Sequence, residues 1–534
     1  MQRNNILRTI AWGVSVVWLL FTVVLSIGSE LSKFPEFLTE IIPKEPIIGP
    51  IDDIRKEISV YDWQEMEILI PNDQKYEEQP DNNTSRFKVY VYSAYYDWRI
   101  GMIRINSLIP LSFDERIKME CGINVDNNIY KGVIRTVIHK EHHNKKYASS
   151  TLLCRIDCNK INVEDIQKVS FEMFELENRN NKSEMWIALK KIPRSNFNVH
   201  ELSICVRPWW GETTSNGSMG NKQTFNNAAL MLEFINSYLY LGVEKFYLYQ
   251  NYLELDENVK MVINYYLEVK KVLEIVPYTI PVIPFKQVWD FAQTTMIQDC
   301  LLRSTGRTRY LLFVDTDEFV FPSLKDYSLV DYLNIVSSTP YYNNKVGAMW
   351  IPMYFHFLEW ESDTINVERY SSIDKEIKKE MDDLDFILYR KTCRMLSSGT
   401  KKSDKTRRKV IVRPERILYM GIHEPETMLN ATFHFIKIPM VNITGKGELG
   451  LSLHHYRKAN GIVNNDPKKR ELVDMYLENT CSNALSNARD NKSIGVVRDD
   501  IVWITFGTNL YQNILQDIKE MKVISAKKET IDTH

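Results

Sequence analysis

A helix–glycine–strand pattern, present twice, constrains the fold of this chain more than any other feature. Residues 227–241 carry apolar side chains at helical spacing, a glycine ends the pattern, and residues 245–249 have the pattern of a strand. Residues 289–304 repeat the helical pattern, a second glycine follows, and residues 310–314 form a short apolar run typical of a buried strand. Helices alternating with strands predict an α/β domain with a largely parallel sheet.

An acidic pair, Asp315 and Asp317, directly follows the second predicted strand. In parallel sheets ligands bind beyond the carboxyl ends of the strands, which is where this pair falls. Two carboxylates can hold a hard divalent ion, which then bridges the phosphate oxygens of a sugar nucleotide. Asp383 and Asp385 have the same spacing within a charge-rich stretch, so spacing alone leaves a metal site and a polar strand end equally open.

Residues 445–450 contain three glycines at the spacing of a dinucleotide-binding loop. An extended segment, residues 451–455, follows them in place of a helix whose N-terminus could hold a pyrophosphate, so we predict a plain loop. His454 and His455 end this segment, and Arg457 follows. An imidazole could bind the same metal as the acidic pair and Arg457 could bind a phosphate, while a satisfied pair of partly buried histidines is the alternative.

Two further polar stretches have simple interpretations. The basic run between Lys401 and Lys409 could contact a diphosphate or a charged acceptor, or could be a solvated loop. Glu141, His142 and His143 lie among lysines and predict a surface turn. The chain has no nucleophile elbow and no Walker loop, which argues against hydrolase and kinase functions. Its net charge of -2 with 25% charged residues argues against a nucleic-acid partner.

An uncharged apolar run covers residues 10–28, about 19 residues or about 28 Å of helix, close to the thickness of a bilayer core. Arg3 and Arg8 precede the run, so the positive-inside rule predicts a type II signal anchor with residues 1–9 in the cytosol and the rest in the lumen. A cleaved signal peptide is the alternative, because residues 26–28 resemble a cleavage site, although the run exceeds the usual apolar core of such peptides.

A lumenal location agrees with two residue types. Sequons for N-glycosylation occur at Asn82, Asn83, Asn181, Asn216, Asn430, Asn442 and Asn491. Seven cysteines are present, namely Cys121, Cys154, Cys158, Cys205, Cys300, Cys393 and Cys481. An oxidising compartment favours disulfides with at least one thiol left over. Cys154 and Cys158 could also bind zinc, but no second pair at ligand spacing accompanies them.

The composition changes along the chain and predicts its organisation. Residues 29–85 are rich in Pro, Glu, Asp and Asn and are typical of a stem. Residues 86–199 show the alternation of a β-rich N-terminal region, and residues 200–460 hold the predicted α/β domain. Residues 461–534 form a C-terminal extension, helical over about 467–489, whose last dozen residues predict a frayed polar tail.

Several short motifs, taken in order, resemble glycosyltransferase family 92. They run from about Lys88 to Arg457: YSAYYD at residues 92–97, CVRPWWGE at 205–212, EFI at 233–235, LGVEKFYLY at 241–249, DC at 299–300, LFVDTDEFV at 312–320, ERY at 368–370, KVIVRP at 409–414, MGIH at 420–423 and HYR at 455–457. No single motif is decisive, but their order and spacing are specific.

This resemblance implies a GT-A-like nucleotide-sugar-binding domain, inverting chemistry, a UDP-sugar donor that is typically UDP-galactose, and a manganese-like divalent metal. Carried over to this chain, Asp315 and Asp317 bind the metal and the diphosphate. His455 is the implied third metal ligand, with His454 as the alternative. Lys409 would lie near the donor or its phosphates.

The resemblance also places His423 near the donor, but the acceptor side departs from the family. The family usually has a small glycine-containing turn where this chain has residues 355–360, FHFLEW. An inverting transfer needs a carboxylate that deprotonates the acceptor hydroxyl. Four residues are candidates: Glu359, Glu361, Asp363 and Glu424. Glu359 is favoured because it follows a strand in an aromatic setting that could bind sugar.

The sequence thus predicts an inverting, metal-dependent galactosyltransferase. It would act on glycans of glycoproteins or glycolipids, on the lumenal side of the Golgi or another secretory-pathway membrane. A transferase for another UDP-sugar, such as UDP-N-acetylglucosamine, is one alternative, because donor choice depends on a few pocket contacts. A non-catalytic sugar-binding ectodomain on the same fold is another, although the presence of both Asp315 and Asp317 speaks against it.

Overall fold

The computed structural model of the chain describes residues 63–71, 84–112, 114–125, 128–156, 163–194, 200–208, 227–250, 255–360, 386–395, 408–458, 496–499, 501–507 and 509–532. The chain divides into two compact units, Met1–Glu57 and Ile58–His534, and all described residues belong to the second. The predicted membrane span, residues 10–28, and most of the predicted stem lie outside the described residues, as does the predicted helix at about 467–489.

The N-terminal strands close into a barrel. Seven of them pair in the order β2–β3–β6–β5–β4–β7–β8, a parallel pairing of β2 with β8 completes the ring, and β1 pairs with β2 alone. The strands are β1 (Gln64–Pro71), β2 (Thr84–Asp97), β3 (Met102–Pro110), β4 (Ile117–Val125), β5 (Asn128–Ile138), β6 (Tyr147–Arg155), β7 (Lys168–Glu175) and β8 (Lys182–Lys191), with a 3-10 turn η4 (Val163–Asp165). Alternating apolar residues such as Val89, Ile105 and Phe171 fill the interior.

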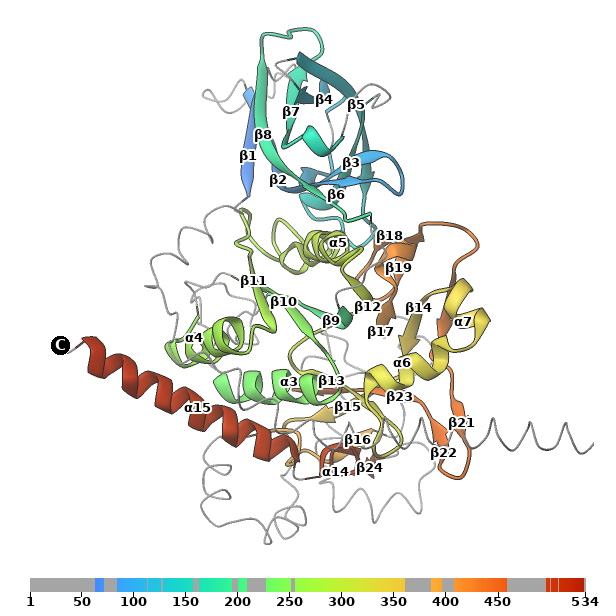
Figure 1. The fold of residues 1–534 in the computed structure, drawn as a ribbon. Coiled ribbons are helices and arrows are strands. Elements are labelled where there is room, and N and C mark those ends of the chain that lie inside the picture. Colours follow the sequence, from blue (N-terminus) through green and yellow to red (C-terminus); the bar gives the residue numbers. More distant parts are fainter. Residues whose placement is uncertain are drawn as a thin grey trace, which may run out of the picture. The chain divides into compact units, whose positions relative to one another are not determined.

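A seven-stranded mixed sheet follows, in the order β11–β10–β9–β12–β17–β14–β20 (Figure 1). Its strands are β9 (His200–Val206), β10 (Lys245–Gln250), β11 (Leu273–Pro277), β12 (Thr308–Val314), β14 (Val346–Ile351), β17 (Lys409–Val412) and β20 (His434–Lys437). Strands β11, β10, β9 and β12 are mutually parallel, and β17 runs antiparallel to both β12 and β14. The carboxyl ends of β9 and β12 and the amino end of β17 therefore meet at one edge.

The described helices are α3 (Ala228–Tyr240), α4 (Glu257–Asn264), a π-helical turn η6 (Tyr265–Val269), η7 (Asp290–Ala292), α5 (Gln293–Ser304), α6 (Leu329–Ser337), α7 (Pro340–Lys345), α14 (Ile501–Phe506) and α15 (Asn509–Asp532). The predicted helix–glycine–strand units correspond to α3 with β10 and to α5 with β12. The Asn227 side chain begins α3 by accepting a hydrogen bond from Leu230 N at 2.9 Å. Gly242 and Gly306, with φ of 91° and 76°, follow the two helices.

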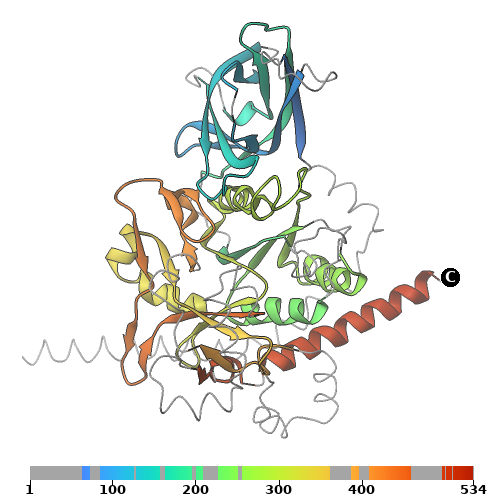
Figure 2. The ribbon, with the colours of Figure 1, turned by 180° about the vertical axis from the view of Figure 1, so that it is seen from behind.

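Helix α15 continues to Asp532 and so includes most of the stretch predicted as a polar tail. Leu510 and Ile514, in its first half, are buried in the main core, so an apolar face docks the beginning of the helix. Seen from behind, α15 runs along α3 (Figure 2).

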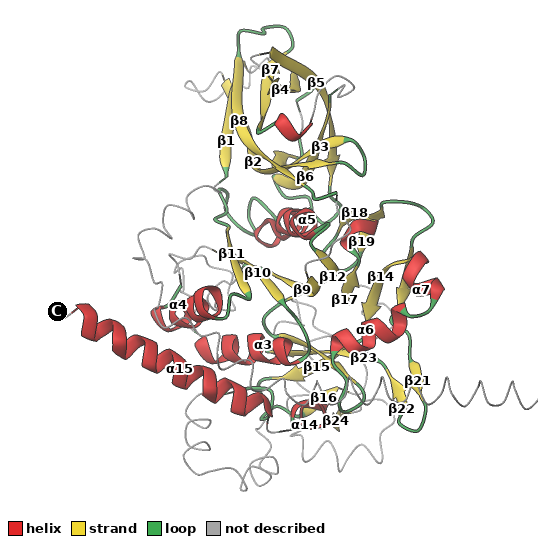
Figure 3. Cartoon of the chain, in the orientation of Figure 1, coloured by secondary structure: helices red, strands yellow, loops and turns green. Residues whose placement is uncertain are grey.

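The predicted fold class, an α/β chain preceded by a transmembrane helix, was wrong for this chain. Strands predominate over helices throughout the described residues (Figure 3), and the N-terminal region closes on itself as a seven-stranded ring. The closure joins residues 94–96 to residues 189–191, and a pairing across that sequence separation leaves no trace in local periodicity. Within the described part of the chain, no helix has the length and apolar character needed to cross a bilayer.

Three strands form a small sheet in the order β13–β23–β15: β13 (Glu318–Pro322), β15 (Met353–Phe357) and β23 (Leu451–Arg457). The remaining elements are the pairs β16 (Cys393–Met395) with β24 (Val496–Arg498), β18 (Ile417–Met420) with β19 (Pro425–Met428) and β21 (Val441–Ile443) with β22 (Gly447–Leu449), and a 3-10 turn η9 (Pro414–Arg416). Gly445 lies in the β21–β22 turn, Gly447 begins β22 and Gly450 precedes β23. The predicted loop is thus in part a strand, and the segment after it is extended, as predicted.

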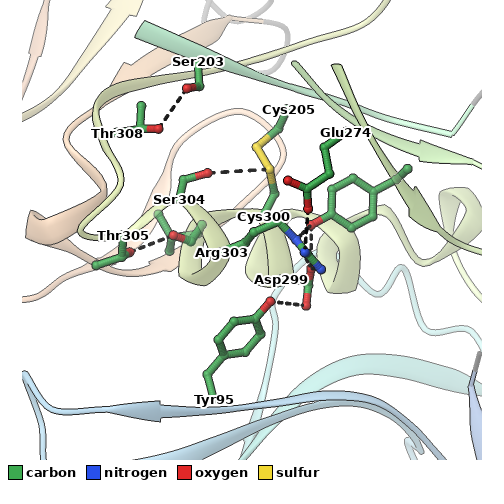
Figure 4. Close-up of a disulfide and its surroundings, with 12 residues drawn as sticks. Tyr95, Ser203, Cys205, Glu274, Asp299, Cys300, Arg303, Ser304, Thr305 and Thr308 are labelled. Atoms are coloured by element: carbon green, nitrogen blue, oxygen red, sulfur yellow. Dashed lines mark hydrogen bonds and ion pairs between the residues drawn. A yellow bond between two sulfur atoms is a disulfide. The ribbon is translucent and has the colours of Figure 1, made fainter. Parts of the chain in front are cut away.

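Helix α5 packs against barrel strands β2, β3 and β6 and is anchored there by a buried carboxylate. Asp299 is fully buried, accepts hydrogen bonds from Tyr95 of the barrel at 2.8 Å and Tyr249 of β10 at 2.5 Å, and forms an ion pair with Arg303 at 3.0 Å. Figure 4 shows Asp299 between Tyr95 and Arg303, next to the disulfide that joins β9 to α5. One side chain thus connects the barrel, the central sheet and α5.

Two disulfides lie within the described residues, Cys121–Cys154 in the barrel and Cys205–Cys300 between β9 and α5. Cys154 is therefore in a disulfide, as predicted in preference to a zinc site, while Cys158 lies outside the described residues.

Removing either disulfide is expected to destabilise the protein. The Cys205–Cys300 bridge spans 95 residues and the Cys121–Cys154 bridge spans 33. Because loop-closure entropy grows as 1.5R ln n, the paired Cys205→Ser and Cys300→Ser change is expected to cost about 1 kcal/mol more than the matching change at the barrel bridge, within a total of about 2–5 kcal/mol. Urea unfolding of the two double variants measures the difference, and a larger loss at the barrel bridge would contradict this order.

Candidate active site

The candidate site lies at the edge where three strands of the central sheet bring polar residues together. Arg207 directly follows β9, Asp315 directly follows β12, and Lys409 begins β17. The last residues of the parallel strands β9 and β12, Val206 and Val314, pair with each other. Because β17 is antiparallel, its first residue shares this edge with their carboxyl ends.

Asp315 lies at the centre of this edge, with 11% of its side chain exposed. Its Oδ1 is 3.1 Å from Arg207 Nε and 3.4 Å from Lys409 Nζ. Among the described residues, none makes a hydrogen bond of good geometry to this buried oxygen. The two ion pairs offset the burial of this oxygen, and its lone pairs leave room for a further interaction with a bound ligand or ion.

Asp317 lies beside His455, and strand pairing explains why. Strands β13 and β23 are antiparallel with Glu318 opposite His455, and Tyr456 N donates to Asp317 O at 2.8 Å. His455 Nε2 is 3.2 Å from Asp317 Oδ2, and its Nδ1 is 3.5 Å from Glu318 Oε1. With 33% of its side chain exposed, Asp317 is more accessible to solvent than Asp315 or Glu318.

His454 has different partners, because successive side chains of a strand point to opposite faces. Its Nδ1 is 2.9 Å from His356 Nε2 and its Nε2 is 2.9 Å from the Ser452 hydroxyl, both in the protein interior. Of the two predicted histidines, His455 is therefore the one that the structure brings to the acidic pair.

The charges of the site are mutually stabilised. Burial raises the pKa of Asp315, but the charges of Arg207 and Lys409 outweigh it and hold the pKa below 3.8. Burial likewise opposes ionisation of Asp317, and His455 lowers its pKa well below the usual range. Burial and the charge of Asp315 raise the pKa of Glu318, whose Oε2 accepts from Asp315 N at 2.8 Å and pairs with Lys409 Nζ at 3.1 Å.

Arg457 ends β23 on the same side, and its charge interacts with that of Asp317. Burial lowers its pKa, and its Nε has no hydrogen bond to any described group. Lys409, Arg207 and Arg457 thus place three cations around the acidic residues. Such a group can bind a phosphorylated ligand, since guanidinium and ammonium groups form charge-assisted hydrogen bonds with phosphate oxygens.

The candidate bases Glu359 and Glu424, and also His423, lie outside the group formed by Asp315, Asp317 and their ion-pair partners. Glu359 is exposed and follows β15, whose last residue pairs with Arg457, so it lies at the edge of the small sheet that also carries Arg457. Glu424 is exposed and pairs with Arg408, while His423 Nδ1 lies 3.1 Å from Arg408 O. Within the described residues, none of these three side chains forms an ion pair with Asp315 or Asp317. Glu361 and Asp363 lie outside the described residues, as do Asp383 and Asp385.

The sequence analysis gave no role to Arg207 or Glu318, although both lie in motifs of the family resemblance, and it did not name Asp290 at all. Arg207 could have been found, because a cation immediately after a predicted strand falls at the same edge as Asp315. Asp290 Oδ2 lies 3.7 Å from Arg207 Nη1, although 25 positions separate Asp290 from Asp315 in the chain. Burial raises its pKa. Its position depends on the local backbone, which no motif indicated.

Residues 141–143 lie in a turn with His143 exposed, as predicted, but this turn also makes contacts that the sequence did not indicate. Glu141 is half-buried, and its carboxylate accepts a hydrogen bond from Ile422 N. His143 stacks on Trp289 with ring centroids 3.9 Å apart. This barrel turn is therefore in contact with the domain that carries the site.

The residues present fit a divalent cation that is shared with a ligand. Within the described residues, no three His, Cys, Asp or Glu side chains are already grouped as a metal cage. Asp317 Oδ2 and His455 Nε2, 3.2 Å apart, have the separation of two adjacent ligands of an octahedral ion at about 2.1 Å, which is about 3 Å. Ions of this kind are commonly held by one or two protein ligands together with substrate phosphates and water.

The sheet edge, the acidic pair and the surrounding cations define a site for a phosphate-bearing substrate. The sequence model of glycosyltransferase family 92 matches residues 220–488, half of the chain, and includes nearly all of this site. Beta-1,4-galactosyltransferase galt-1 of Caenorhabditis elegans is 26% identical over 400 residues, which cover 71% of this chain and 78% of that protein. The chain belongs to glycosyltransferase family 92, which confirms the resemblance seen in the sequence, and it is a glycosyltransferase.

Proposed function

We propose that this glycosyltransferase transfers galactose from UDP-galactose to a glycan of a glycoprotein or glycolipid, with inversion at the anomeric carbon and with a divalent ion, Mn²⁺, at Asp315, Asp317 and His455. The observation that carries the proposal is the pairing of Asp317 with His455 beside Asp315, whose Oδ1 is ion-paired but accepts no hydrogen bond from the described residues. The similarity to a galactosyltransferase supports the choice of sugar.

The cations of the site would bind and stabilise the diphosphate. Lys409 is 4% exposed, and its charge is maintained by Asp315 and Glu318, which raise its pKa against the effect of burial. Together with Arg207 and Arg457 it would neutralise the charge that grows on the UDP leaving group as the glycosidic bond breaks. When bound, the divalent ion supplies Lewis-acid stabilisation of the same diphosphate oxygens.

Glu359 is the proposed base. Its exposed carboxylate stands beyond the end of β15, where an acceptor hydroxyl can approach from solvent. In an inverting transfer the base takes the proton of the acceptor hydroxyl while that oxygen attacks the face of the sugar opposite UDP. His423 would lie near the donor or its phosphates, and Glu424 is an alternative candidate for the base.

We place this activity in the lumen of the Golgi or another secretory-pathway compartment. The Cys121–Cys154 and Cys205–Cys300 disulfides support this placement, since such bonds form and persist in oxidising compartments. Asn430 and Asn442, two of the predicted sequon residues, are exposed and thus accessible on the folded surface.

The test is a donor and metal panel with the purified chain. UDP-galactose with Mn²⁺ and mixed N-glycans is expected to release UDP and to add one hexose to a glycan by mass, with configuration inverted. Chelation by EDTA is expected to abolish both signals, and added Mn²⁺ to restore them. Turnover with UDP-N-acetylglucosamine but not with UDP-galactose would show that the donor is not UDP-galactose. Unchanged turnover in EDTA would show that the reaction needs no divalent ion.

A further inference from the structure

Three consecutive residues before α5 have a left-handed backbone although none of them is glycine. Asp290, Phe291 and Ala292 have φ of 39°, 57° and 55°. Such conformations cost of order 1–3 kcal/mol each for residues with a Cβ, and they persist only where the surroundings impose them. The segment therefore holds Asp290 in a position that an unstrained entry into α5 would not give.

The surroundings that impose this backbone come from both the barrel and the sheet. Tyr147 N, at the start of barrel strand β6, donates to Gln287 O at 2.8 Å, and His143 of the preceding loop stacks on Trp289. The Tyr278 hydroxyl, just beyond β11, donates to Ala292 O at 2.8 Å. Contacts on both sides of the segment thus fix the direction of the Asp290 side chain.

The guanidinium of Arg207 lies between the Asp290 carboxylate and Asp315. Its Oδ2 is 3.7 Å from Arg207 Nη1, and Arg207 Nε is 3.1 Å from Asp315 Oδ1. With 22% of its side chain exposed, Asp290 remains open to a ligand. Arg207 directly follows β9 and Asp315 directly follows β12, so Asp290, through its ion pair with Arg207, lies at the ligand-binding edge of the sheet.

The chemistry of a carboxylate limits what Asp290 can bind. An ionised carboxylate only accepts hydrogen bonds, whereas the diphosphate of a nucleotide sugar offers no donor and carries the same sign of charge. The hydroxyl groups of the sugar are donors without charge. We infer that Asp290 binds hydroxyl groups of the donor sugar and thereby contributes to donor specificity, an inference that rests on the proposed use of a nucleotide sugar.

Two substitutions separate this role from a purely structural one. Asp290→Gly removes the carboxylate and suits the left-handed backbone, while Asp290→Asn keeps the shape and tolerates positive φ. The matched control is Asp326→Gly, since Asp326 also has a positive φ, 65°, but is exposed in the turn that follows β13. Comparable melting temperatures are expected for these proteins and for the wild type.

The measurement is the affinity of each protein for UDP and for UDP-galactose by titration calorimetry with Mn²⁺. Asp290→Gly is expected to bind UDP-galactose about 10- to 100-fold more weakly while UDP affinity stays within about twofold, because hydrogen bonds to a charged group contribute about 1.5–3 kcal/mol. Asp290→Asn is expected to lose less, and Asp326→Gly to lose nothing.

Two outcomes would overturn the inference alone. An equal loss for UDP and UDP-galactose would mean that Asp290 acts on the UDP part of the donor, either through Arg207 and the diphosphate or through donors of the ribose or uracil. No loss for either ligand would mean that Asp290 does not face the donor. A wild-type protein that binds neither UDP nor UDP-galactose would refute the proposed function and this inference with it. Ligand binding by the wild type therefore distinguishes failure of the proposed function from failure of the inference about Asp290.

Discussion

Asp317→Asn is expected to lower kcat/KM for sugar transfer by about 1,000-fold while the protein stays folded. The substitution removes the charge of the most open acidic residue of the site, which lies 3.2 Å from His455. A divalent ion contributes several kcal/mol of charge stabilisation in the transition state, and each 1.36 kcal/mol corresponds to tenfold in rate. Release of UDP from UDP-galactose, with Mn²⁺ and a glycan acceptor, measures the loss.

The control for this change is Asp326→Asn, at an aspartate in the turn that follows β13. Asp326 is exposed, and asparagine tolerates its φ of 65°. We expect unchanged kcat/KM for this variant and similar circular dichroism spectra for both. Activity of Asp317→Asn within tenfold of the wild type would rule out Asp317 as a metal ligand.

The acidic pair could be placed from a local pattern, whereas the assignment of His455 beside it came from the family resemblance. Asp315 follows a short apolar strand, and alternation along β23 separates the environments of His454 and His455. The register that brings His455 to Asp317 was not visible, because the pairing of β13 with β23 joins residues more than 100 positions apart. The family resemblance supplied that association where periodicity could not.

Other parts of the site and fold were hidden for related reasons. The left-handed backbone of Asp290 lies in a segment with no glycine to indicate it, and contacts from the barrel impose it. The polar turn at Glu141 and His143 has the composition of a surface loop, yet it packs on Trp289 and Ile422. Tertiary contacts decide these features, so propensity and spacing alone could not predict them.

Asp299→Ala is expected to cost about 3–5 kcal/mol of stability, the range for removing one partner of a buried ion pair. Asp299 is fully buried and pairs with Arg303, and Lys190 of the barrel lies 3.9 Å away. The substitution leaves both cations without this carboxylate and removes the acceptor of the Tyr95 hydroxyl. Urea unfolding followed by tryptophan fluorescence measures the loss.

The surface pair Asp114 with Arg116 provides the matched control for that experiment. Both side chains are partly exposed, so Asp114→Ala is expected to cost less than about 1 kcal/mol. An Asp299→Ala protein as stable as Asp114→Ala would show that the barrel and the sheet are held together by apolar contacts alone.

The contribution of Asp299 is also expected to depend on pH, and its direction follows from the pKa. Burial opposes ionisation of Asp299, but the charges of Arg303 and Lys190 outweigh it and lower the pKa well below 3.8. A carboxyl whose pKa is lower in the folded than in the unfolded state binds fewer protons when folded, so its stabilisation is complete above the unfolded pKa of about 3.9 and declines as pH falls below it.

The difference in unfolding free energy between wild type and Asp299→Asn should therefore be constant from pH 5 to 7 and shrink below about pH 4. A difference that grows on acidification would mean that Asp299 is protonated in the folded protein, and that Arg303 takes its counter-charge from Glu274, 2.9 Å away.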